Sequence, residues 1–416
     1  MASEKDRKDR YDVAIVGAGP AGAASASLLA RSGWRVALLD KATFPRDKPC
    51  AEYLSPAAEP LLRELGVLDS LLAIHPGRLR GFRIYAPNGR VFQGDFAATR
   101  DANGHSYFET GLAVPRLRLD AALVQTATAA GAELREDWRL AQLTRDADGW
   151  TLTPSGEREP VRARLLLAAD GVHSTVARRL NLHIPTRMRK VALVAHMRGI
   201  AGLADYGEMH VANRRYVGLA PLESPDSGEH GDLCNVAMVV DEARDGRRLA
   251  GRPQDFLIET LASFPRLRGR LDHLTIVRRT LTISRICVKA RRRSDDGMLL
   301  VGDAGGYYDP FTGEGIYRAL RGAQLAAQVA NAALEHDDLS ANILAQYEHL
   351  LRAEFRGKRT VERIIQAAVQ APPLMNHIAA IMNRRPAMAD TVVAVTGDFL
   401  PASAVLRPGY LLRLIV

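Results

Sequence analysis

A glycine-rich segment near the amino end constrains the fold more than any other feature of this 416-residue chain. Gly17, Gly19 and Gly22 form a Gly-x-Gly-x-x-Gly pattern between an apolar run, Tyr11–Val16, and an Ala/Leu-rich run, Pro20–Arg31. A strand that enters a glycine turn and continues into a helix directs unpaired backbone N–H groups toward one point, which suits a pyrophosphate. The pattern therefore predicts a strand–helix–strand unit that binds a dinucleotide.

Residues within and after the pattern extend this prediction. Pro20 and Ala21 open the predicted helix and are included among the predicted cofactor contacts. Asp40 closes the next predicted strand, Arg35–Asp40, about 20 residues after the glycines, where an acid can accept hydrogen bonds from a ribose. Lys41 is a further candidate for cofactor contact, with a solvated lysine as the alternative.

Charge, cysteine and histidine content narrow the functional class. Lys and Arg outnumber Asp and Glu by 56 to 47, and the net charge of +9 is spread along the chain. This balance suits anionic substrates, a nicotinamide dinucleotide phosphate or an acidic membrane surface. The chain has no basic stripe with interleaved aromatic residues, so we expect no nucleic-acid binding. Three widely separated cysteines and no metal-ligand spacing of histidines predict reduced thiols and no metal site.

The amino end and the hydropathy pattern indicate where the protein resides. A charged start runs directly into the first predicted strand, which leaves no room for a secretory signal. The chain also contains no uncharged apolar stretch of membrane-spanning length. We expect a soluble cytoplasmic protein with, at most, peripheral membrane contact.

Two kinds of strand pattern alternate along the chain. Uninterrupted apolar runs such as Leu165–Ala169 and Met298–Val301 are typical of buried parallel strands. A hairpin signal at Asn88-Gly89 and the strand-like pieces between Pro185 and Arg285 instead indicate an antiparallel sheet. We expect an α/β fold in which a Rossmann-type domain (11–80, 108–184 and 286–340) is interrupted by a mainly antiparallel β substrate domain (81–107 and 185–285) and followed by C-terminal helices (341–416).

Two later segments again place an acid and a glycine after a buried strand. They are Asp170-Gly171, which precedes a helix start, and Gly302-Asp303. With the first glycine pattern they match, in order and spacing, a flavoprotein fold. From Tyr11 to about Arg413 the chain resembles aromatic hydroxylases, the class A flavoprotein monooxygenases, and geranylgeranyl reductases. The resemblance implies an FAD-binding domain with tightly bound FAD. Because the chain holds one complete glycine pattern, NAD(P)H is expected as a transient electron donor.

The resemblance assigns cofactor contacts to these segments and to one helix. Gly302 and Asp303 resemble the family segment whose acid hydrogen-bonds the ribitol chain. Asp170-Gly171 resembles the segment that touches the FAD pyrophosphate and the incoming nicotinamide, with a helix-capping aspartate as the alternative. Arg116 resembles the arginine that reaches the flavin phosphates from a helix start, since a guanidinium presents a fixed fork of donors. Arg118 is the competing candidate.

A third segment resembles the family's Pro-x-x-Gly-x-Gly loop. It contains Pro310, Gly313, Gly315 and Ile316, and it opens a predicted helix that extends to Leu334. Helix N–H groups directed at the pyrimidine end of an isoalloxazine would stabilise negative charge on a reduced flavin. We count Pro310 and Gly313 among the candidate catalytic residues and Gly313, Gly315 and Ile316 among the cofactor contacts.

The segment from Phe44 to Cys50 resembles the Pro-Arg-x-Lys-x-Cys-Gly-Gly stretch of geranylgeranyl reductases. Arg46 is a candidate contact for the flavin or for NAD(P)H, with an exposed loop arginine as the alternative. Cys50 is a candidate to protonate or position a substrate, with a small buried hydrophobe as the alternative. Ala51-Glu52 replaces the two glycines of that family. This departure weakens the transfer of reductase chemistry to this chain.

A predicted strand at residues 215–220 lies where flavin-dependent halogenases carry tryptophans. Tyr216 is a candidate to border the substrate cavity, with a plain strand as the alternative. The Trp-x-Trp-x-Ile-Pro motif is missing from the sequence. Halogenation is therefore disfavoured.

Three functions remain open at the level of sequence. The favoured one is an NAD(P)H-dependent FAD monooxygenase that hydroxylates or epoxidises an apolar or aromatic compound. The first alternative is a geranylgeranyl reductase-like enzyme that saturates isoprenoid double bonds, because fold does not fix function. A non-catalytic flavin-binding protein is the second alternative, disfavoured by the intact loop at residues 309–316. The sequence leaves the substrate, the choice between NADH and NADPH, and the oligomeric state open.

The C-terminal region adds a hint about the substrate. Helices between Ile364 and Met382 could pack on the core, cover the substrate cavity or touch a membrane. The last residues, from Leu406 onward, resemble the tail of bacterial FAD-dependent oxidoreductases associated with polyketide pathways. A polyketide-like or alkyl-phenol substrate is therefore plausible.

Overall fold

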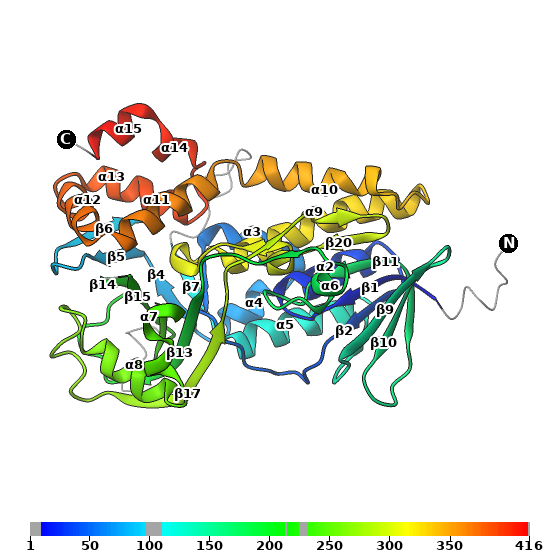
Figure 1. Ribbon diagram of the computed structural model, residues 1–416, viewed down its shortest axis with the longest axis horizontal. Coiled ribbons are helices and arrows are strands. Elements are labelled where there is room, and N and C mark those ends of the chain that lie inside the picture. Colours follow the sequence, from blue (N-terminus) through cyan, green and yellow to red (C-terminus); the bar gives the residue numbers. More distant parts are fainter. Residues whose placement is uncertain (1–9, 97–109, 213, 224–231, 415–416) are drawn as a thin grey trace.

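The computed structural model describes residues 10–96, 110–212, 214–223 and 232–414. A parallel sheet with its helices forms one part of the molecule, an antiparallel sheet forms the other, and the C-terminal helices cover one side of the latter (Figure 1). The boundary expected at residues 107 and 108, the charged first nine residues and most of the polar loop after Glu223 lie outside the described residues.

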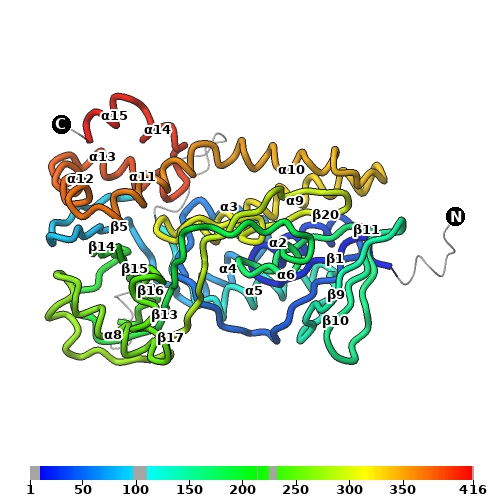
Figure 2. Tube along the Cα trace, viewed as in Figure 1, coloured from blue at the N-terminus to red at the C-terminus, as the bar shows by residue number. Residues whose placement is uncertain are grey.

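The parallel sheet is built on the predicted strand–helix–strand unit. Its strands follow the order β19-β20-β11-β1-β2-β8, with β10 and β9 added to β11 as an antiparallel extension. Strands β20, β11, β1, β2 and β8 run parallel, although they come from distant parts of the sequence (Figure 2). The bounds are β1 (Tyr11–Val16), β2 (Val36–Leu39), β8 (Glu133–Arg135), β9 (Leu140–Asp146), β10 (Gly149–Pro154), β11 (Val161–Ala168), β19 (Ser294–Asp295) and β20 (Met298–Leu300).

Alternation along the parallel strands explains the two layers around this sheet. Val13 and Ile15 of β1 pack with helices α2 (Pro20–Arg31), α5 (Arg116–Ala129) and α9 (Gly315–Glu335). Ala14 and Val16 face the opposite side, where β9, β10 and the short helix α6 (Thr175–Arg179) lie. Since a strand buried on both faces must be apolar throughout, this packing accounts for the uninterrupted apolar runs.

The antiparallel sheet holds the predicted hairpin and the later strands together. Its order in the described residues is β17-β13-β16-β15-β14-β5-β6, and every neighbouring pair is antiparallel except β14 with β5. The domain bounds given above stay predictions. The strands are β5 (Gly81–Tyr85), β6 (Val91–Asp95), β13 (Lys190–Arg198), β14 (Gly207–Ala212), β15 (Arg215–Pro221), β16 (Cys234–Asp241) and β17 (Thr275–Ser284).

Helices cover both faces of the antiparallel sheet. Helices α7 (Glu242–Leu249) and α8 (Pro253–Leu261) lie on one side, where Phe256 and Leu257 pack against Val217 and Met238. The other face carries C-terminal helices, which join Ile84 and Phe92 in a second apolar cluster. Three of these helices begin at a proline, because proline suits the first helical position. The helices on this side are α11 (Lys358–Gln370), α12 (Pro372–Arg384), α13 (Pro386–Thr396), α14 (Ser403–Leu406) and α15 (Pro408–Arg413), whereas α10 (Ala341–Glu354) packs on α9, β19 and β20.

Short elements connect the two sheets. The periodic segment from Pro56 to Leu72 is divided at Gly66, whose φ of 75° ends the first helix in a left-handed cap. The remaining elements are β3 (Tyr53–Leu54), α3 (Glu59–Leu65), α4 (Leu68–Leu72), β4 (Gly77–Leu79), β7 (Gly111–Ala113), β12 (His183–Ile184), β18 (Val288–Ala290) and β21 (Gly306–Tyr307). Within the described ranges, no helix is both long and apolar enough to cross a membrane.

Candidate functional site

A cavity with an empty volume of about 1080 Å³ connects the three predicted cofactor segments. It runs from the start of α2 past the end of β11 to the start of α9, and strands β13, β16 and β17 form its opposite wall. The predicted site residues in its lining are Gly19, Pro20, Ala21, Cys50, Arg116, Gly171, Asp303, Pro310, Gly313, Gly315 and Ile316.

The three glycines of the first turn have different physical roles. Gly17 has a φ of +100°, and a Cβ there would lie 2.5 Å from the carbonyl oxygen of Ala169. A Cβ on Gly22 would lie 1.7 Å from the carbonyl oxygen of Gly17. The atoms nearest to the place of a Cβ on Gly19 are guanidinium nitrogens, at 3.5 Å for Arg46 and 3.8 Å for Arg116. Gly17 and Gly22 therefore shape the turn, and Gly19 leaves its backbone open toward two cations.

Asp40 ties the glycine turn to the end of β2. Its Oδ2 accepts the N–H of Ala18 at 2.7 Å, and its Oδ1 accepts the N–H of Ala42 at 2.9 Å. The carboxylate therefore stabilises the turn directly, and its contact with a ribose stays a prediction. Lys41 is exposed and does not join the cavity lining. The structure favours the alternative of a solvated lysine.

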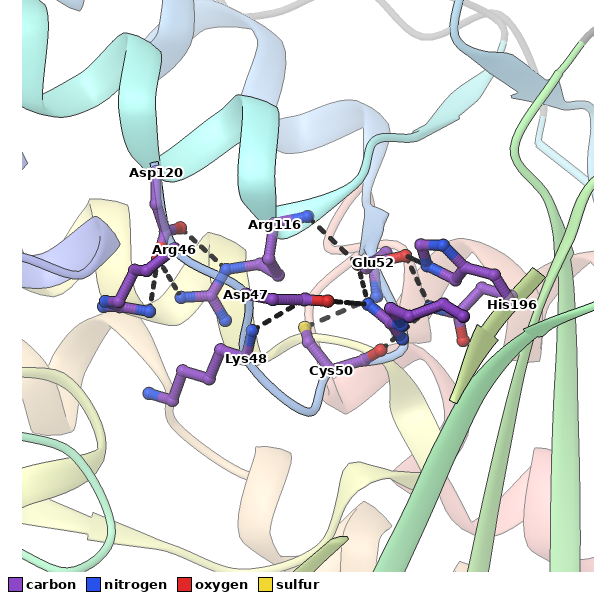
Figure 3. A network of polar contacts seen from close by, with 10 residues as sticks. Arg46, Asp47, Lys48, Cys50, Glu52, Arg116, Asp120 and His196 are labelled. Carbon is purple, nitrogen blue, oxygen red and sulfur yellow. Dashed lines mark hydrogen bonds and ion pairs between the residues drawn. The ribbon is translucent and has the colours of Figure 1, made fainter. Parts of the chain in front are cut away.

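Two arginines and a buried aspartate meet beside Gly19 (Figure 3). Arg116 donates from Nε and Nη2 to the two carboxylate oxygens of Asp120, each at 2.7 Å, and Arg46 lies 3.0 Å from Asp120 Oδ2. Burial lowers the pKa of Arg116, but the Asp120 carboxylate and Cys50 together more than offset burial and raise it. Arg116 stays cationic at the turn. The competing candidate, Arg118, is exposed.

Lys48 lies in the cavity wall, although the sequence patterns did not mark it as a site residue. Its Nζ is 3.4 Å from the position that a Cβ on Gly171 would occupy. Burial first, and then the Arg116 charge, lower the pKa of Lys48. Burial raises the pKa of Asp303, which Lys48 and Arg116 oppose. The cavity thus holds a cationic group and an acid at the strand end where a ribitol contact was predicted.

Asp170 caps a helix, which was the alternative weighed for it. Its Oδ2 accepts the N–H groups of Thr175 at 2.6 Å and Val176 at 3.2 Å at the start of α6. Its Oδ1 is buried and has no partner among the described residues. Gly171, with a φ of +78°, reaches the cavity itself. The structure therefore gives Asp170 a capping role, and the cofactor contacts predicted for Asp170 and Gly171 stay predictions.

The turn before α9 approaches the cavity closely. Gly313 has a φ of +73°, and a Cβ there would lie 2.6 Å from the ring of Tyr53. Behind the turn, Asp309 Oδ2 accepts from Lys190 Nζ at 2.6 Å, and its Oδ1 accepts from Gln366 Nε2 at 2.6 Å. Strand β13 and helix α11 therefore hold a turn that neither of them adjoins in sequence.

Tyr216 also supports the turn at Asp309, and it is not among the residues that line this cavity or the apolar cavity described below. Its side chain is 2% exposed, and its hydroxyl donates to Asp309 Oδ1 at 2.7 Å. Its ring lies 5.0 Å from that of Phe311 between centroids. The prediction that Tyr216 borders the substrate cavity is therefore corrected, because β15 directs this side chain into the interior. Tyr216 positions the turn.

Glu52 is the residue that sequence reasoning most undervalued. It stands where the related reductases have glycine, and its φ of +59° keeps a backbone conformation typical of glycine. The side chain is fully buried and lies among polar partners from four other segments (Figure 3). Its Oε2 contacts His196 Nε2 and Asn235 Nδ2, each at 2.6 Å, and its Oε1 accepts the Arg116 N–H at 3.0 Å.

Cys50 is fixed by the same network. Its Sγ accepts the N–H of Glu52 at 3.4 Å, and its carbonyl oxygen accepts from Asn235 at 3.0 Å. Cys50 is one of the residues that line the cavity. Its catalytic role stays a prediction. Glu52 and Asn235 hold Cys50 in position, and His196 holds Glu52.

A second, apolar cavity with an empty volume of about 980 Å³ lies across the same turn. Phe311 and Thr312 line this cavity, whereas Pro310 and Gly313 line the first one. Helices α11, α12, α13 and α15 form most of its wall, and Phe82, Ile84 and Phe92 close it from the antiparallel sheet. The C-terminal helices thus cover a cavity, which was one of the options for them.

The fold and the first cavity together define a dinucleotide-binding protein of the flavoprotein type, with glycines, cations and a helix start arranged around one elongated space. A family model described as an FAD binding domain matches residues 10–363. The chain therefore belongs to this FAD-binding family of oxidoreductases.

Proteins with different names are similar to this chain, two of them in sequence and one in fold. The chain is 28% identical to conditioned medium factor receptor 1 of Dictyostelium discoideum over 97% of this chain and 80% of that one. It is 30% identical to a digeranylgeranylglycerophospholipid reductase of Methanosarcina acetivorans, over 82% of this chain and 79% of the reductase. The flavin-dependent brominase Bmp2 has the same fold, with a TM-score of 0.79 at 19% identity over 96% of this chain and 98% of the brominase.

Proposed function

We propose that this FAD-dependent oxidoreductase is an NAD(P)H-dependent monooxygenase that hydroxylates or epoxidises an apolar or aromatic, polyketide-like compound. The apolar cavity carries the proposal. Among the residues that the structure describes, its lining contains no charged side chain, and the hydroxyl groups of that lining come from Thr312, Thr396 and Tyr410. A cavity of this kind favours an uncharged hydrophobic substrate. It lies one turn of chain from the cavity that suits FAD.

The first cavity fits FAD by the chemistry of its donors. Arg46 and Arg116 face the open backbone of Gly19, where a pyrophosphate would be held. Lys48 and Asp303 have no hydrogen-bond partner for their charged groups within the described residues, and both line the cavity wall. When bound, FAD supplies electron-transfer chemistry that protein side chains lack.

The chain's own residues would prepare the reaction. The N–H groups at the start of the long helix α9 would stabilise negative charge next to Gly313 and Gly315. Lys190, Tyr216 and Gln366 hold the preceding Asp309, so the turn keeps its place. The apolar walls would exclude water from the substrate and orient it against Phe311 and Thr312 of the turn.

Replacing Asp303 by alanine should weaken FAD binding at least tenfold. Losing a hydrogen bond to a charged group costs about 1.5–3 kcal/mol, and each 1.4 kcal/mol is about tenfold in affinity. Fluorescence titration of the apoprotein with FAD measures the change. Asp146→Ala, at an exposed position in β9, should bind FAD as the wild type does. An Asp303→Ala protein with wild-type affinity would remove this residue from the site.

A carboxylate in the apolar cavity should raise KM without loss of flavin. Ile364 lines the cavity and is 38% exposed, so Ile364→Asp should fold. A bound apolar substrate would desolvate the new charge, and we expect KM to rise about tenfold or more. Ala367→Asp on the exposed side of the same helix is the matched control. Equal KM values for the two variants would place the substrate elsewhere.

A second candidate function is saturation of isoprenoid double bonds. Two observations favour it: the 30% identity to the archaeal reductase, and the φ of +59° at Glu52, a backbone conformation typical of the glycine that the resembling reductase motif has there. An alkyl-lined cavity would also suit an isoprenoid chain. Both functions need reduced flavin, but only the oxygenase needs molecular oxygen.

The two functions are separated by their products. FAD-loaded protein is reduced anaerobically with NADPH and then mixed with candidate apolar compounds, either with isotopically labelled oxygen gas or without oxygen. We expect product that carries one labelled oxygen atom and forms only with oxygen. Saturated product formed without oxygen would replace our proposal by the reductase. Flavin that stays oxidised with both NADPH and NADH would contradict an NAD(P)H-dependent enzyme of either kind.

A further inference from the structure

A third cavity, distinct from the two already described, carries a high density of positive charge. Its empty volume, which includes open solvent, is about 2000 Å³, and its walls come from β18, β21, α9, α10 and α11. Nine lysine or arginine side chains line it, against three acidic ones. Mutual repulsion among so many cations is costly unless anions offset it.

The acidic residues of the molecule pair with only some of these cations. Arg318 is held by Glu314 and Glu362, and Arg352 pairs with Glu348. Across the described ranges, no ion pair or hydrogen bond engages the side chains of Arg187, Lys289 and Arg356. All three are exposed to the cleft from separate segments. Three cations of independent origin thus converge without a protein partner.

Arg293 lies deeper in the same cleft. Its Nε donates to the carbonyl oxygen of Gly305 at 2.8 Å, and a Cβ on Gly306 would lie 3.6 Å from its Nη2. Burial lowers the pKa of Arg293, the Arg318 charge lowers it further, and Tyr347 and Glu348 only partly offset this. The bare backbone at Gly306, where no atom lies closer than 3.4 Å to the place of a Cβ, leaves space beside the guanidinium for an oxyanion.

The cleft adjoins the FAD cavity. Asp303 and Tyr307 line both spaces, so the cleft and the FAD cavity share part of their walls. A ligand in the cleft would therefore lie next to the cofactor.

We propose that this cleft binds the phosphate groups of an organic phosphate ester or diphosphate that takes part in the reaction. Arginine forks and lysine match phosphate oxygens in geometry and charge. Two sources share this chemistry: the electron donor NADPH, or a substrate with a diphosphate head such as a prenyl diphosphate. The binding itself does not depend on the reaction proposed above.

Binding to the FAD-loaded protein tests the proposal, because bound FAD keeps the probes out of its own site. Inorganic pyrophosphate, NADP⁺ and geranyl diphosphate are titrated separately by calorimetry. The variant Arg187→Gln/Lys289→Gln/Arg356→Gln should weaken binding of pyrophosphate and of at least one organic probe tenfold or more. The matched control Arg162→Gln/Arg247→Gln/Arg268→Gln removes the same charge from exposed positions outside the cleft and should change binding less than twofold.

The organic probes distinguish the sources. Tighter binding of NADP⁺ than of pyrophosphate identifies the electron donor, and tighter binding of geranyl diphosphate identifies a substrate head. Pyrophosphate binding that neither organic compound exceeds would mean an adventitious anion only and would overturn the proposal. Equal weakening by the two triple variants would also overturn it. No arm requires turnover, so the result is independent of whether the enzyme is an oxygenase or a reductase.

Discussion

The Gly17→Val protein should purify without flavin and without yellow colour. A side chain at this position meets the carbonyl oxygen of Ala169 at 2.5 Å, a backbone atom that cannot move without disturbing β11. The φ of +100° adds strain of about 1–3 kcal/mol for a residue other than glycine. Absorbance of the purified protein in the flavin band, relative to that at 280 nm, gives the occupancy.

Gly33→Val separates backbone strain from loss of the binding turn. Gly33 has a φ of +89°, close to that of Gly17, but no atom lies within 4 Å of the place of its Cβ. This variant should lose some stability and keep its flavin. A Gly17→Val protein with wild-type flavin content would contradict both the turn geometry and its role in holding FAD.

Glu52→Ala should destabilise the protein by about 3–5 kcal/mol, because it removes one side of a buried charge network. Burial by itself would raise the pKa of Glu52, but the hydrogen bond and charge of His196, with the Arg116 N–H and Asn235, lower it below the usual range. Arg278 also approaches Glu52 at 3.3 Å. Urea unfolding at about pH 7 measures the loss.

The pH dependence gives this prediction a second readout. A depressed carboxyl pKa contributes stability above the unfolded pKa of about 4.3, and this contribution is lost as the pH falls through the folded value. The stability gap between wild type and Glu52→Gln, which keeps the volume but not the charge, should therefore narrow in acid. Asp47→Ala, which removes the more exposed partner of Arg278, should cost about 1 kcal/mol or less. A gap that widens in acid would show that Glu52 is not held as the carboxylate.

Local signals predicted much of the fold. Strand β1 and helix α2 have the expected bounds, because the glycine turn and the change of period mark both ends. The hairpin at Asn88-Gly89 and the helix starts at Pro372 and Pro386 follow from turn and proline geometry. The two-residue strands β12 and β21 could not be predicted, since so short a segment has no period.

The candidate site also contained residues that could be predicted from the sequence and residues that could not. Residues in glycine-rich turns, such as Gly171 and Gly313, could be found because backbone geometry restricts their identity. The contacts of Glu52 with His196 and Asn235 join residues about 140 to 180 positions apart, and no local pattern encodes them. Tyr216 was misplaced because β15 is buried on both faces, so alternation gives no direction for its side chain.

The hydrogen bond from Gln366 to Asp309 shows that residues beyond the family match help to hold the turn before α9. The match to the FAD binding family stops at residue 363, just before this glutamine. A polypeptide trimmed to the family boundary would leave Asp309 and Lys190 facing each other without their third partner and would uncover the apolar space beneath α11. The segment after residue 363 therefore both fixes the turn before α9 and lines the apolar cavity, so a change in one of these features is expected to affect the other.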